Sequence, residues 1–488
     1  MRILFVASEG LPFSKTGGLA DVVEALPKAL VAQGHDVAVI LPRYRNTQTK
    51  NVVIKSLTVP MGTALRFPSV AVAAPPGGVQ YFFVDDPGYF DREQLYGIGG
   101  RDYPDNAERF AEFARAAIEL AKQLWLPDVI HCHDWQSALV PVLLRTAYAP
   151  DPQLSPVPVI FTIHNMGYHG LFARDVLARI GLPDSLFRME ALEFFGHVNY
   201  LKGGLVFSDY LTTVSRKYAQ EIQTTEYGHG LDGVVRTRAD HLVGILNGVD
   251  YSVWNPEVDT LIEARYSARD LSGKQACKRD LLAQFGLPDG NFTRPLIGIV
   301  SRFADQKGFD LLAQVADELM QEDLAIVALG SGEAKHERMF RELARQFPER
   351  LAVKIAYDNM LAHKIEAGAD IFLMPSRYEP CGLNQIYSLR YGTVPVVRAT
   401  GGLDDTIEPF EPADGRGTGF KFSEYKGPAL MAALREALAA YRDTQAWQRL
   451  QTNGMAKDFS WNASALEYGR LYDVARKGRI RTAAVSSK

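Results

Sequence analysis

The sequence predicts an α/β fold made of two doubly wound domains that face each other across a cleft. Short runs rich in β-branched residues alternate with helical stretches through most of the 488 residues, which is the pattern of parallel sheets covered by helices on both faces. The alternation lapses near residues 248–270 and then starts again. A chain of this length can form two or three domains with full cores.

The composition excludes some classes of binding partner and indicates a cellular compartment. The net charge is −4 and no block of five like charges occurs, so we expect neither a nucleic-acid partner nor an anionic membrane surface. No apolar run approaches the roughly 18 residues of a membrane span. The three cysteines are far apart, at Cys132, Cys277 and Cys381, which indicates reduced thiols. With no secretory or plastid leader at the N-terminus, we expect a cytoplasmic protein.

The first domain is expected over residues 1–250. It begins with a strand over 3–7, a loop to Gly18 and a helix over 19–33 that ends at Gly34. Residues 51–84 are β-rich with Gly and Pro breaks, and a helix is expected over 106–124. The remaining strands are expected over residues 37–41, 129–133, 157–162, 210–214 and 242–246.

The second domain is expected over residues 251–460 and repeats the alternation. Its strands are expected over 296–300, 324–329, 351–355, 371–374 and 394–397. Its helices are expected over 309–320, 333–346 and 362–367, and later helices over 428–441, 444–458 and 463–476 have no strands between them. We also expect residues 461–488 to form a C-terminal helix that packs back on the first domain, with a frayed polar tail from Lys477.

The loop at residues 374–383 combines a carboxylate with the start of a helix. Its sequence is Met-Pro-Ser-Arg-Tyr-Glu-Pro-Cys-Gly-Leu, and a helix follows to Arg390. Strand, polar loop, glycine and helix expose free backbone N–H groups, which suit an anion. Because Glu379 would repel a phosphate, it fits the hydroxyl-rich part of the same ligand, so the loop indicates a nucleotide sugar. A surface turn with Glu379 in water is the alternative.

Three other loops at strand ends carry glycines or cations. They contain Lys15-Thr16-Gly17-Gly18, Arg302 and Lys307, and Thr400-Gly401-Gly402. An Arg gives bidentate contacts to phosphate oxygens and a Lys gives a point charge. Each feature alone is more often a tight turn or a solvated helix face, but together they favour a diphosphate ligand. The glycine fingerprints of dinucleotide oxidoreductases and P-loop NTPases are absent.

The segment His131-Cys132-His133-Asp134 can be interpreted as a metal site or as part of a sugar-binding site. Strand alternation points both histidines the same way, but no second ligand cluster at zinc spacing accompanies them. Trp135 and Gln136, next to Asp134, fit a sugar better because an indole face contacts C–H groups while amides and carboxylates bind hydroxyls.

Three other candidates keep structural alternatives. His164-Asn165 follows strand 157–162 and reads as a sugar contact or as a satisfied structural pair. Asn247-Gly248 closes the last strand of the first domain, where a turn is the obvious alternative. Tyr357 follows strand 351–355 and either stacks on a base or caps the sheet edge.

Taken in order, five motifs of this chain resemble the family of bacterial glycogen synthases and plant starch synthases. They are Lys15–Val22, His133–Trp135, His164–Asn165, Asn247–Asp250 and Glu379–Leu383. The resemblance runs from residue 1 to about 475 and implies a GT-B fold with two Rossmann-like domains, the first on the acceptor side and the second binding the nucleotide sugar. It implies retaining transfer of α-glucose from ADP-glucose to the non-reducing end of glycogen or another α-1,4-glucan. No metal and no other cofactor is implied.

The resemblance also implies roles for individual residues. The catalytic set would be Glu379, His164, Arg302 and Lys307. Donor binding would involve Lys15, Gly18, Asn247, Tyr357, Cys381, Gly382, Leu383 and Thr400. The acceptor side would involve Asp21, Asp134, Trp135 and Asn165.

Two positions depart from patterns of related transferases. Asn384 stands where the family usually has Thr, a small polar exchange that leaves the expected reaction unchanged. Tyr387 stands where many other retaining transferases of this fold carry a second glutamate, which argues against sucrose-synthase-like and lipid-sugar enzymes. The lack of a leader favours the bacterial over the plastid branch.

The expected chemistry follows from charge. Breaking the bond between the anomeric carbon and the phosphate leaves positive charge on the sugar and negative charge on the diphosphate, which Arg302 and Lys307 would stabilise. Double displacement would need a carboxylate on the opposite face of the sugar. Glu379 shares a loop with the phosphate-binding amides, so we expect it to hold hydroxyls while the acceptor attacks from the leaving-group side. His164 would shield the sugar cation.

Other functions remain open from the sequence. One is a transferase of the same fold that uses UDP-glucose or another acceptor. A second is a catalytically inactive glucan-binding protein on the same scaffold, which the full set of Lys15, Arg302, Lys307 and Glu379 disfavours. A Rossmann oxidoreductase is the third, disfavoured by the missing glycine fingerprint.

Overall fold

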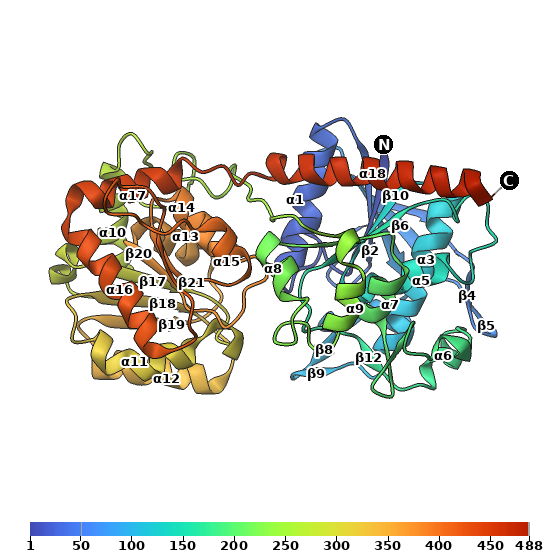
Figure 1. The fold of residues 1–488 in the computed structure, drawn as a ribbon, viewed down its shortest axis with the longest axis horizontal. Helices are drawn as coiled ribbons and strands as arrows, with labels where there is room; N and C mark the ends of the chain where they lie inside the picture. The colour runs from blue at the N-terminus through green and yellow to red at the C-terminus, as the bar shows by residue number, and fades with distance from the viewer. Residues whose placement is uncertain (50, 487–488) are drawn as a thin grey trace. The chain divides into compact units, whose positions relative to one another are not determined.

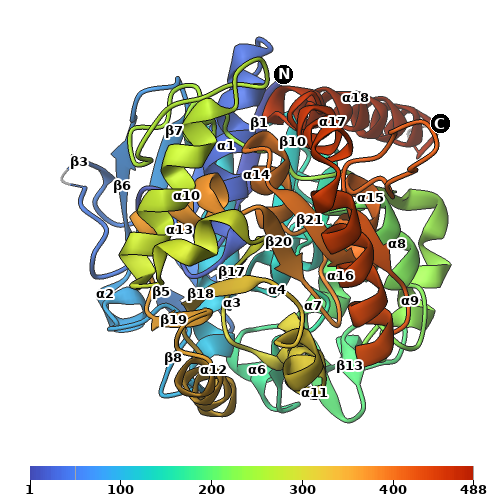
Figure 2. The same cartoon turned by 90° about the vertical axis from the view of Figure 1, so that its left-hand side faces the viewer.

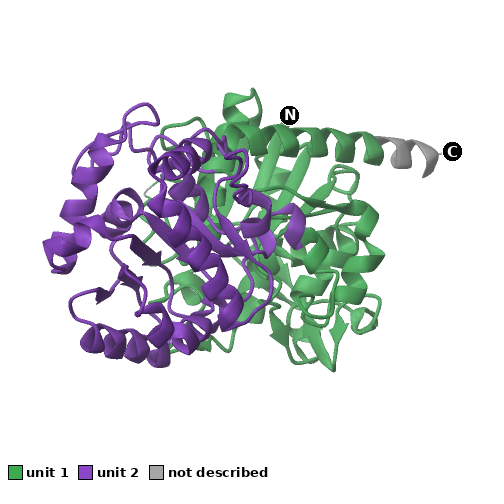
Figure 3. Ribbon diagram, turned by 60° about the vertical axis from the view of Figure 1, so that its left-hand side comes forward, with its two compact units in different colours: residues 1–214, 219–248, 461–488 green, residues 215–218, 249–460 purple. Residues whose placement is uncertain are grey.

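The computed structural model describes residues 1–49 and 51–486 and divides into two compact units. Unit 1 comprises the chain up to Val214, Ala219–Gly248 and the chain from Trp461; unit 2 comprises Ser215–Tyr218 and Val249–Ser460 (Figure 3). The main division therefore falls where the sequence periodicity lapses. No sequence pattern indicated that Ser215–Tyr218 would belong to unit 2.

Unit 1 contains a nine-stranded sheet with the order β16-β15-β11-β10-β1-β2-β7-β6-β3. Strands β2, β6 and β10 of this sheet are labelled in Figure 1. Neighbouring strands are parallel from β16 to β7, and β6 and β3 continue the edge in antiparallel pairing. The expected parallel sheet is thus extended by the β-rich segment at residues 51–84. The strands are β1 Arg2–Val6, β2 Asp36–Pro42, β3 Asn51–Ile54, β6 Ser69–Ala73, β7 Gln80–Asp85, β10 Val129–His133, β11 Val159–Ile163, β15 Tyr210–Thr213 and β16 Leu242–Gly244.

Helices α1 (Gly18–Ala32) and α18 (Trp461–Ser486) cover one face of this sheet. The residues of α18 that enter the core recur every three or four positions, as one helix face requires: Trp461, Ala465, Tyr468, Leu471, Tyr472 and Ala475. Helices α3 (Asn106–Gln123), α5 (Leu139–Leu144) and α7 (Tyr200–Phe207) are the further helices of the unit that pack together. Helix α18 continues beyond Lys477, the start of the expected frayed tail, as far as Ser486; residues 487–488 lie outside the described part.

Unit 2 contains a fully parallel six-stranded sheet with the order β19-β18-β17-β20-β21-β22. Its helices cover both faces, with α10 and α13 on one and α11, α12 and α16 on the other (Figure 2). The strand order reverses between β17 and β20, and ligands of open α/β sheets bind outside the strand ends at such a point. The strands are β17 Leu296–Val300, β18 Ala325–Gly330, β19 Leu351–Ile355, β20 Ile371–Met374, β21 Val394–Arg398 and β22 Phe420–Phe422.

The helices of unit 2 and the short elements of the chain complete the fold. In unit 2 the helices are α10 Ser272–Phe285, α11 Phe309–Leu319, α12 Ala334–Gln346, α13 Asn359–Gly368, α14 Asn384–Arg390, α15 Gly401–Thr406, α16 Gly427–Arg442 and α17 Thr444–Met455. The short elements are β4 Val59–Met61, β5 Ala64–Arg66, α2 Pro87–Phe90, β8 Gly97–Ile98, β9 Arg101–Asp102, α4 Asp134–Ser137, β12 Leu171–Phe172, α6 Val176–Arg179, β13 Glu193–Phe194, β14 His197–Asn199, α8 Arg216–Glu221 and α9 Asp232–Thr237.

Most boundaries differ from the predicted ones by one or two residues, and two of the differences have local causes. The helix expected over 362–367 begins at Asn359, because the Asp358 carboxylate accepts a hydrogen bond from the Leu361 N–H (2.9 Å) and caps an earlier first turn. The strand expected over 242–246 ends at Gly244, since only residues up to Gly244 pair with β15.

The structure contains no helix, within the residues it describes, that combines the length and the apolar character of a membrane span. The three cysteines are buried thiols and form no disulfide.

A buried carboxyl in unit 2 predicts a pH-dependent stability. Glu366 is buried, the Ser388 hydroxyl donates to its Oε2 (2.6 Å), and burial raises its pKa to about 8. The folded chain therefore keeps a proton that the unfolded chain loses near its ordinary pKa of 4.5. This contribution to the free energy of unfolding falls as pH rises, by at most about 1.4 kcal/mol per pH unit between about pH 5 and 8.

We expect Glu366→Gln to remove this fall, because the amide oxygen can still accept the Ser388 bond. Urea unfolding at several pH values in that range should show the variant gaining stability relative to the wild type as pH rises. Glu342→Gln, at an exposed position of α12, is the matched control and should run parallel to the wild type. A Glu366→Gln profile that also runs parallel would contradict a protonated Glu366.

Candidate functional site

Three loops interlock at the carboxyl ends of β17, β20 and β21 in unit 2. A Cβ placed on Gly308 would lie 1.9 Å from the Pro375 carbonyl oxygen, and one on Gly401 would lie 1.9 Å from that of Glu379. Both glycines also have positive φ, 73° and 45°, so side chains are excluded by space and by backbone conformation. Packing between the loops therefore accounts for the glycines of the Thr400-Gly401-Gly402 motif, the structural alternative for that motif.

Lys307 and Glu379 form an ion pair within this group of loops. The distance from Lys307 Nζ to Glu379 Oε2 is 2.6 Å, and the Ser376 hydroxyl donates to the same oxygen (3.1 Å). The two side chains are 19% and 8% exposed. The alternative in which Glu379 faces water is wrong, because its carboxylate is buried and paired.

Two predicted ligand-binding side chains of unit 2 are exposed instead. Arg302 lies on the same loop as Lys307, and its guanidinium has no hydrogen bond or ion pair with any residue that the structure describes. Tyr357, which follows β19, is 84% exposed. A cation and an aromatic ring that make few contacts within the fold are available to a ligand.

The start of α14 is held by side-chain amides. Asn384 Nδ2 donates to the Val300 carbonyl (2.7 Å), which ties the first turn of α14 to the end of β17. Gln385 Nε2 donates to the carbonyls of Cys381 (3.0 Å) and Gly382 (3.1 Å). Asn384 thus supplies a hydrogen-bond donor that fixes the first turn of α14. Four other expected donor-binding residues lie in these loops. Cys381 and Thr400 are buried. Leu383 immediately precedes α14, and Gly382 has a φ of 69°.

In unit 1 the loop after β1 is fixed by a residue that sequence reasoning missed. The Glu9 carboxylate accepts hydrogen bonds from the Thr16 N–H and from the Thr16 hydroxyl (2.9 Å). Lys15 Nζ lies 2.7 Å from Asp21 Oδ1, so these two predicted site residues form an ion pair. Glu9 stands three residues after the last residue of β1, and that place at a strand's carboxyl end is the signal that could have identified it.

Gly17 and Gly18 lie in open space. A Cβ on either would meet no described atom within 4 Å, and neither has a positive φ. Contacts within the unit therefore do not require glycine at these two positions, in contrast to Gly401. Room for a ligand close to the backbone is the property that remains.

A cavity of about 240 Å³ lies beside this loop and is lined in part by Ser14, Lys15, Tyr44 and Arg45. Tyr44 is buried, and its hydroxyl has no hydrogen-bond partner among the described residues. The cavity is therefore polar on one side and is continuous with the predicted Lys15 site.

The segments after β10 and β11 are joined through Asp134. Asp134 has a φ of 54°, and its Oδ1 accepts the His164 N–H (2.8 Å) while its carboxylate also accepts the Asn165 N–H. Burial raises the pKa of Asp134 to about 7. Asp134 thus fixes the backbone that carries the two predicted residues His164 and Asn165.

Trp135 and Asn165 are engaged within unit 1. Trp135 is 7% exposed, and its ring packs edge-on against Phe110 (centroids 5.0 Å apart) and tilted against Phe172 (5.9 Å). The Asn165 Oδ1 accepts the Gly167 N–H (2.9 Å). Both have clear structural contacts, and their expected acceptor role stays a prediction.

Asn247 has an unsatisfied oxygen. The residue is buried, and no described group hydrogen-bonds its Oδ1. Buried polar atoms are nearly always paired, so this amide is suited to a ligand hydroxyl.

Two groups of residues can be weighed as metal sites. The Nδ1 and Nε2 atoms of His131 lie 2.8 Å from the Tyr472 hydroxyl and 2.6 Å from the Thr162 hydroxyl, so both are engaged. Asp305, Glu333 and His336 cluster at ligand spacing, but Lys335 Nζ lies 2.5 Å and 3.2 Å from the two carboxylates. The lysine already neutralises that cluster.

Family models match both units. The model described as the starch synthase catalytic domain matches residues 2–237, and that of group 1 glycosyl transferases matches residues 289–454. The chain is 58% identical over 481 residues to a glycogen synthase from Koribacter versatilis, covering 98% of this chain and 99% of the relative. It is 50% identical over 483 residues to one from Anaeromyxobacter dehalogenans, covering 98% and 100%.

Solved structures agree with these matches. The catalytic domain of starch synthase IV from Arabidopsis thaliana, bound to ADP and acarbose, has a TM-score of 0.88 at 35% identity and covers 97% of this chain and 99% of that one. A sucrose-phosphate synthase from Thermosynechococcus elongatus, at 19% identity and a TM-score of 0.61 with 97% and 98% covered, shares the fold. The two-unit α/β architecture is thus the predicted GT-B fold. The chain belongs to the family of glycogen and starch synthases, which are glycosyltransferases.

Proposed function

We propose that this chain transfers an α-D-glucosyl group from ADP-glucose to the non-reducing end of glycogen or another α-1,4-glucan, with retention and without a metal. The observation that carries the proposal is the Lys307–Glu379 pair (2.6 Å), with the exposed Arg302 on the same loop as Lys307, where the strand order of unit 2 reverses. The names of the glycogen synthase relatives and the ADP in the similar starch synthase structure support it.

In this proposal unit 2 binds the donor. Arg302 and Lys307 contact the diphosphate together with backbone groups at Gly382 and Leu383, and the exposed Tyr357 ring stacks on the adenine. Glu379 accepts hydrogen bonds from glucose hydroxyls, since its contact with Lys307 fixes the orientation of the carboxylate. Cys381 and Thr400 lie in the same group of loops. The exposure of Arg302 and Tyr357 supports these roles.

Unit 1 would carry the acceptor residues and part of the donor contacts. We assign Asp21, Asp134, Trp135 and Asn165 to the acceptor side. Lys15 and Gly18 are assigned to the donor phosphates, and His164 and Asn247 to the glucose. The open space at Gly18 and the unpaired amide oxygen of Asn247 support these assignments.

The reaction breaks the bond between the anomeric carbon and the β-phosphate oxygen. The acceptor hydroxyl attacks from the same face and forms the new glycosidic bond, and the departing phosphate oxygen takes the hydroxyl proton. Burial lowers the pKa of His164 to about 3, so its imidazole is neutral. A neutral ring next to the developing sugar cation avoids the repulsion that an imidazolium would add.

A donor comparison tests the proposal. With glycogen as acceptor, we expect ADP-glucose to support turnover at a kcat/KM at least about tenfold above UDP-glucose, since a tenfold preference needs only about 1.4 kcal/mol of differential transition-state binding. Omitting glycogen is the control and should abolish polymer labelling. A preference for UDP-glucose would contradict the donor assignment. Co-sedimentation with glycogen without turnover of either donor would indicate an inactive glucan-binding protein instead.

A further inference from the structure

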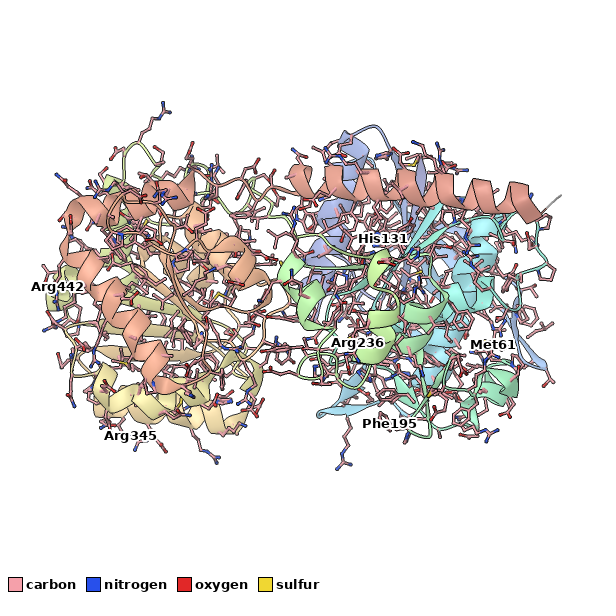
Figure 4. All side chains as sticks on the ribbon, viewed as in Figure 1. Met61, His131, Phe195, Arg236, Arg345 and Arg442 are labelled. Atoms are coloured by element: carbon pink, nitrogen blue, oxygen red, sulfur yellow. The ribbon has the colours of Figure 1, made fainter. Side chains whose placement is uncertain are left out.

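Three histidines form a buried column in unit 1. His131 and His133 lie on β10, and His164 follows β11. The ring centroids of His131 and His133 are 4.2 Å apart, and those of His133 and His164 are 5.2 Å apart. His131, labelled in Figure 4, and His133 are completely buried. The column therefore connects the core of unit 1 to the predicted catalytic His164.

The end of the column away from His164 is fully hydrogen-bonded. His131 lies between the hydroxyls of Tyr472 on α18 and Thr162 on β11, and Thr162 Oγ1 is in turn 2.5 Å from Thr212 Oγ1. Phe5 on β1 stacks on His133, with centroids 5.3 Å apart. These contacts hold the rings of His131 and His133 from two neighbouring strands and one helix.

The contact that reaches His164 is a single hydrogen bond between two rings. His133 Nδ1 lies 3.0 Å from His164 Nε2. Burial lowers the pKa of both residues, so both rings are neutral and one proton is shared by this pair of atoms. The other nitrogen of His133, Nε2, is buried and has no hydrogen-bond partner among the described residues.

The unpartnered nitrogen decides which ring donates. If His164 donated, His133 would carry its own proton on Nε2 and would bury an N–H group with no acceptor. If His133 donates from Nδ1, the unpartnered atom is only a lone pair. Orphaned buried N–H groups are rarer than under-satisfied acceptors, so His133 is the donor.

We propose that His133 is a positioning residue for His164. Its Nδ1–H donates to Nε2 of His164, which fixes the orientation of the His164 ring and places the His164 proton on Nδ1. Asp134 fixes the backbone of His164 through the 2.8 Å bond to its N–H, and His133 fixes the side chain. The inference rests on the proposed function, in which His164 lies at the reacting glucose; hydrogen bonds of this kind set histidine tautomers in other sites.

Three variants distinguish a positioning role of His133 from a purely structural role. His133→Phe keeps a flat ring but removes the donor, and we expect kcat with ADP-glucose and glycogen to fall about tenfold, which corresponds to about 1.4 kcal/mol in the barrier, with both KM values within about twofold of the wild type. His133→Asn retains an N–H near the position of Nδ1 and should restore most of the loss. Tyr472→Phe removes a hydroxyl from the far end of the column and should leave kcat within about twofold.

The tautomer itself is measured by ¹H–¹⁵N NMR on the full chain labelled at histidine, with the His164 signals assigned from a His164→Gln variant. We expect the wild type to show a protonated Nδ1 and an unprotonated Nε2 on His164, and His133→Phe to lose this pattern. A protonated Nε2 on His164 in the wild type would overturn the inference. A kcat of His133→Phe equal to that of the wild type would also overturn it.

This readout keeps the inference distinct from the proposed function. A wild-type chain that shows the expected His164 tautomer but turns over no ADP-glucose would refute the proposed reaction and leave the hydrogen bond established. A chain that is active but has the opposite tautomer would refute only the positioning role.

Discussion

Lys307→Ala is expected to lower kcat with ADP-glucose and glycogen by about 10²- to 10³-fold, the effect of removing one preorganised donor from a developing negative charge. The ammonium of Lys307 is held in place by Glu379, whose carboxylate also accepts a hydrogen bond from the Ser376 hydroxyl, so the ammonium needs no rearrangement when the diphosphate departs. Steady-state kinetics at saturating donor would measure the loss. A turnover within about threefold of the wild type would contradict the diphosphate assignment.

The same substitution has a second effect that must be separated. It leaves the buried Glu379 carboxylate without its cation, and breaking a buried ion pair destabilises by up to about 3–5 kcal/mol. The double variant Lys307→Met with Glu379→Gln removes both charges and should recover stability to urea, whereas kcat should stay low. Recovery of kcat together with stability would show that Lys307 acts only through folding.

A matched control exists in the same unit. Lys364 on α13 pairs with Asp280 on α10 at 2.5 Å, and the two side chains are 13% and 15% exposed. Lys364→Ala also breaks a largely buried pair, so it should lower stability as Lys307→Ala does. Since this pair joins two helices on one face of the sheet, kcat should remain within about twofold of the wild type.

The fold could be predicted from the sequence because each sheet is built from short buried strands at regular spacing. The parallel strands from β16 to β2 and those from β19 to β21 follow from that pattern, whereas β22 (Phe420–Phe422) was not predicted. What the pattern could not give is which residues of distant segments contact each other. Helix α18 completes the core of unit 1 through residues such as Tyr472, which contacts His131 from 341 positions away in the chain.

The charged residues of the candidate site could be predicted from the sequence, but the contacts between them could not. Arg302, Lys307 and Glu379 stand out because cations and a carboxylate follow strands, yet the pairing of Lys307 with Glu379 spans 72 positions and depends on β17 and β20 being neighbours. For the same reason, the sequence did not indicate the contacts that Glu9 and His133 make. Glu9 acts on the backbone of Thr16, and the histidine pair read as a candidate metal site because spacing cannot show that hydroxyls occupy both nitrogens of His131.

Arg302→Ala provides the cleanest test of the diphosphate assignment. Because the Arg302 guanidinium is exposed and has no partner among the described residues, its removal should leave the free energy of unfolding within about 0.5 kcal/mol of the wild type. We nevertheless expect kcat to fall by about 10²- to 10³-fold. An arginine that does nothing for the fold and much for the reaction must act on the substrate.

A lysine at position 302 tests whether the planar guanidinium is needed in addition to the positive charge. Arg302→Lys keeps the charge but loses the planar pair of donors that binds two phosphate oxygens at once, so its kcat should lie between the wild type and Arg302→Ala, about tenfold below the wild type for the loss of one charge-assisted bond. Arg345→Ala, at another exposed arginine of unit 2 on α12 (Figure 4), is the control and should keep both kcat and stability. If Arg302→Ala behaved like Arg345→Ala, the exposed cation at the end of β17 would have no part in catalysis, and the diphosphate would have to be bound by other groups.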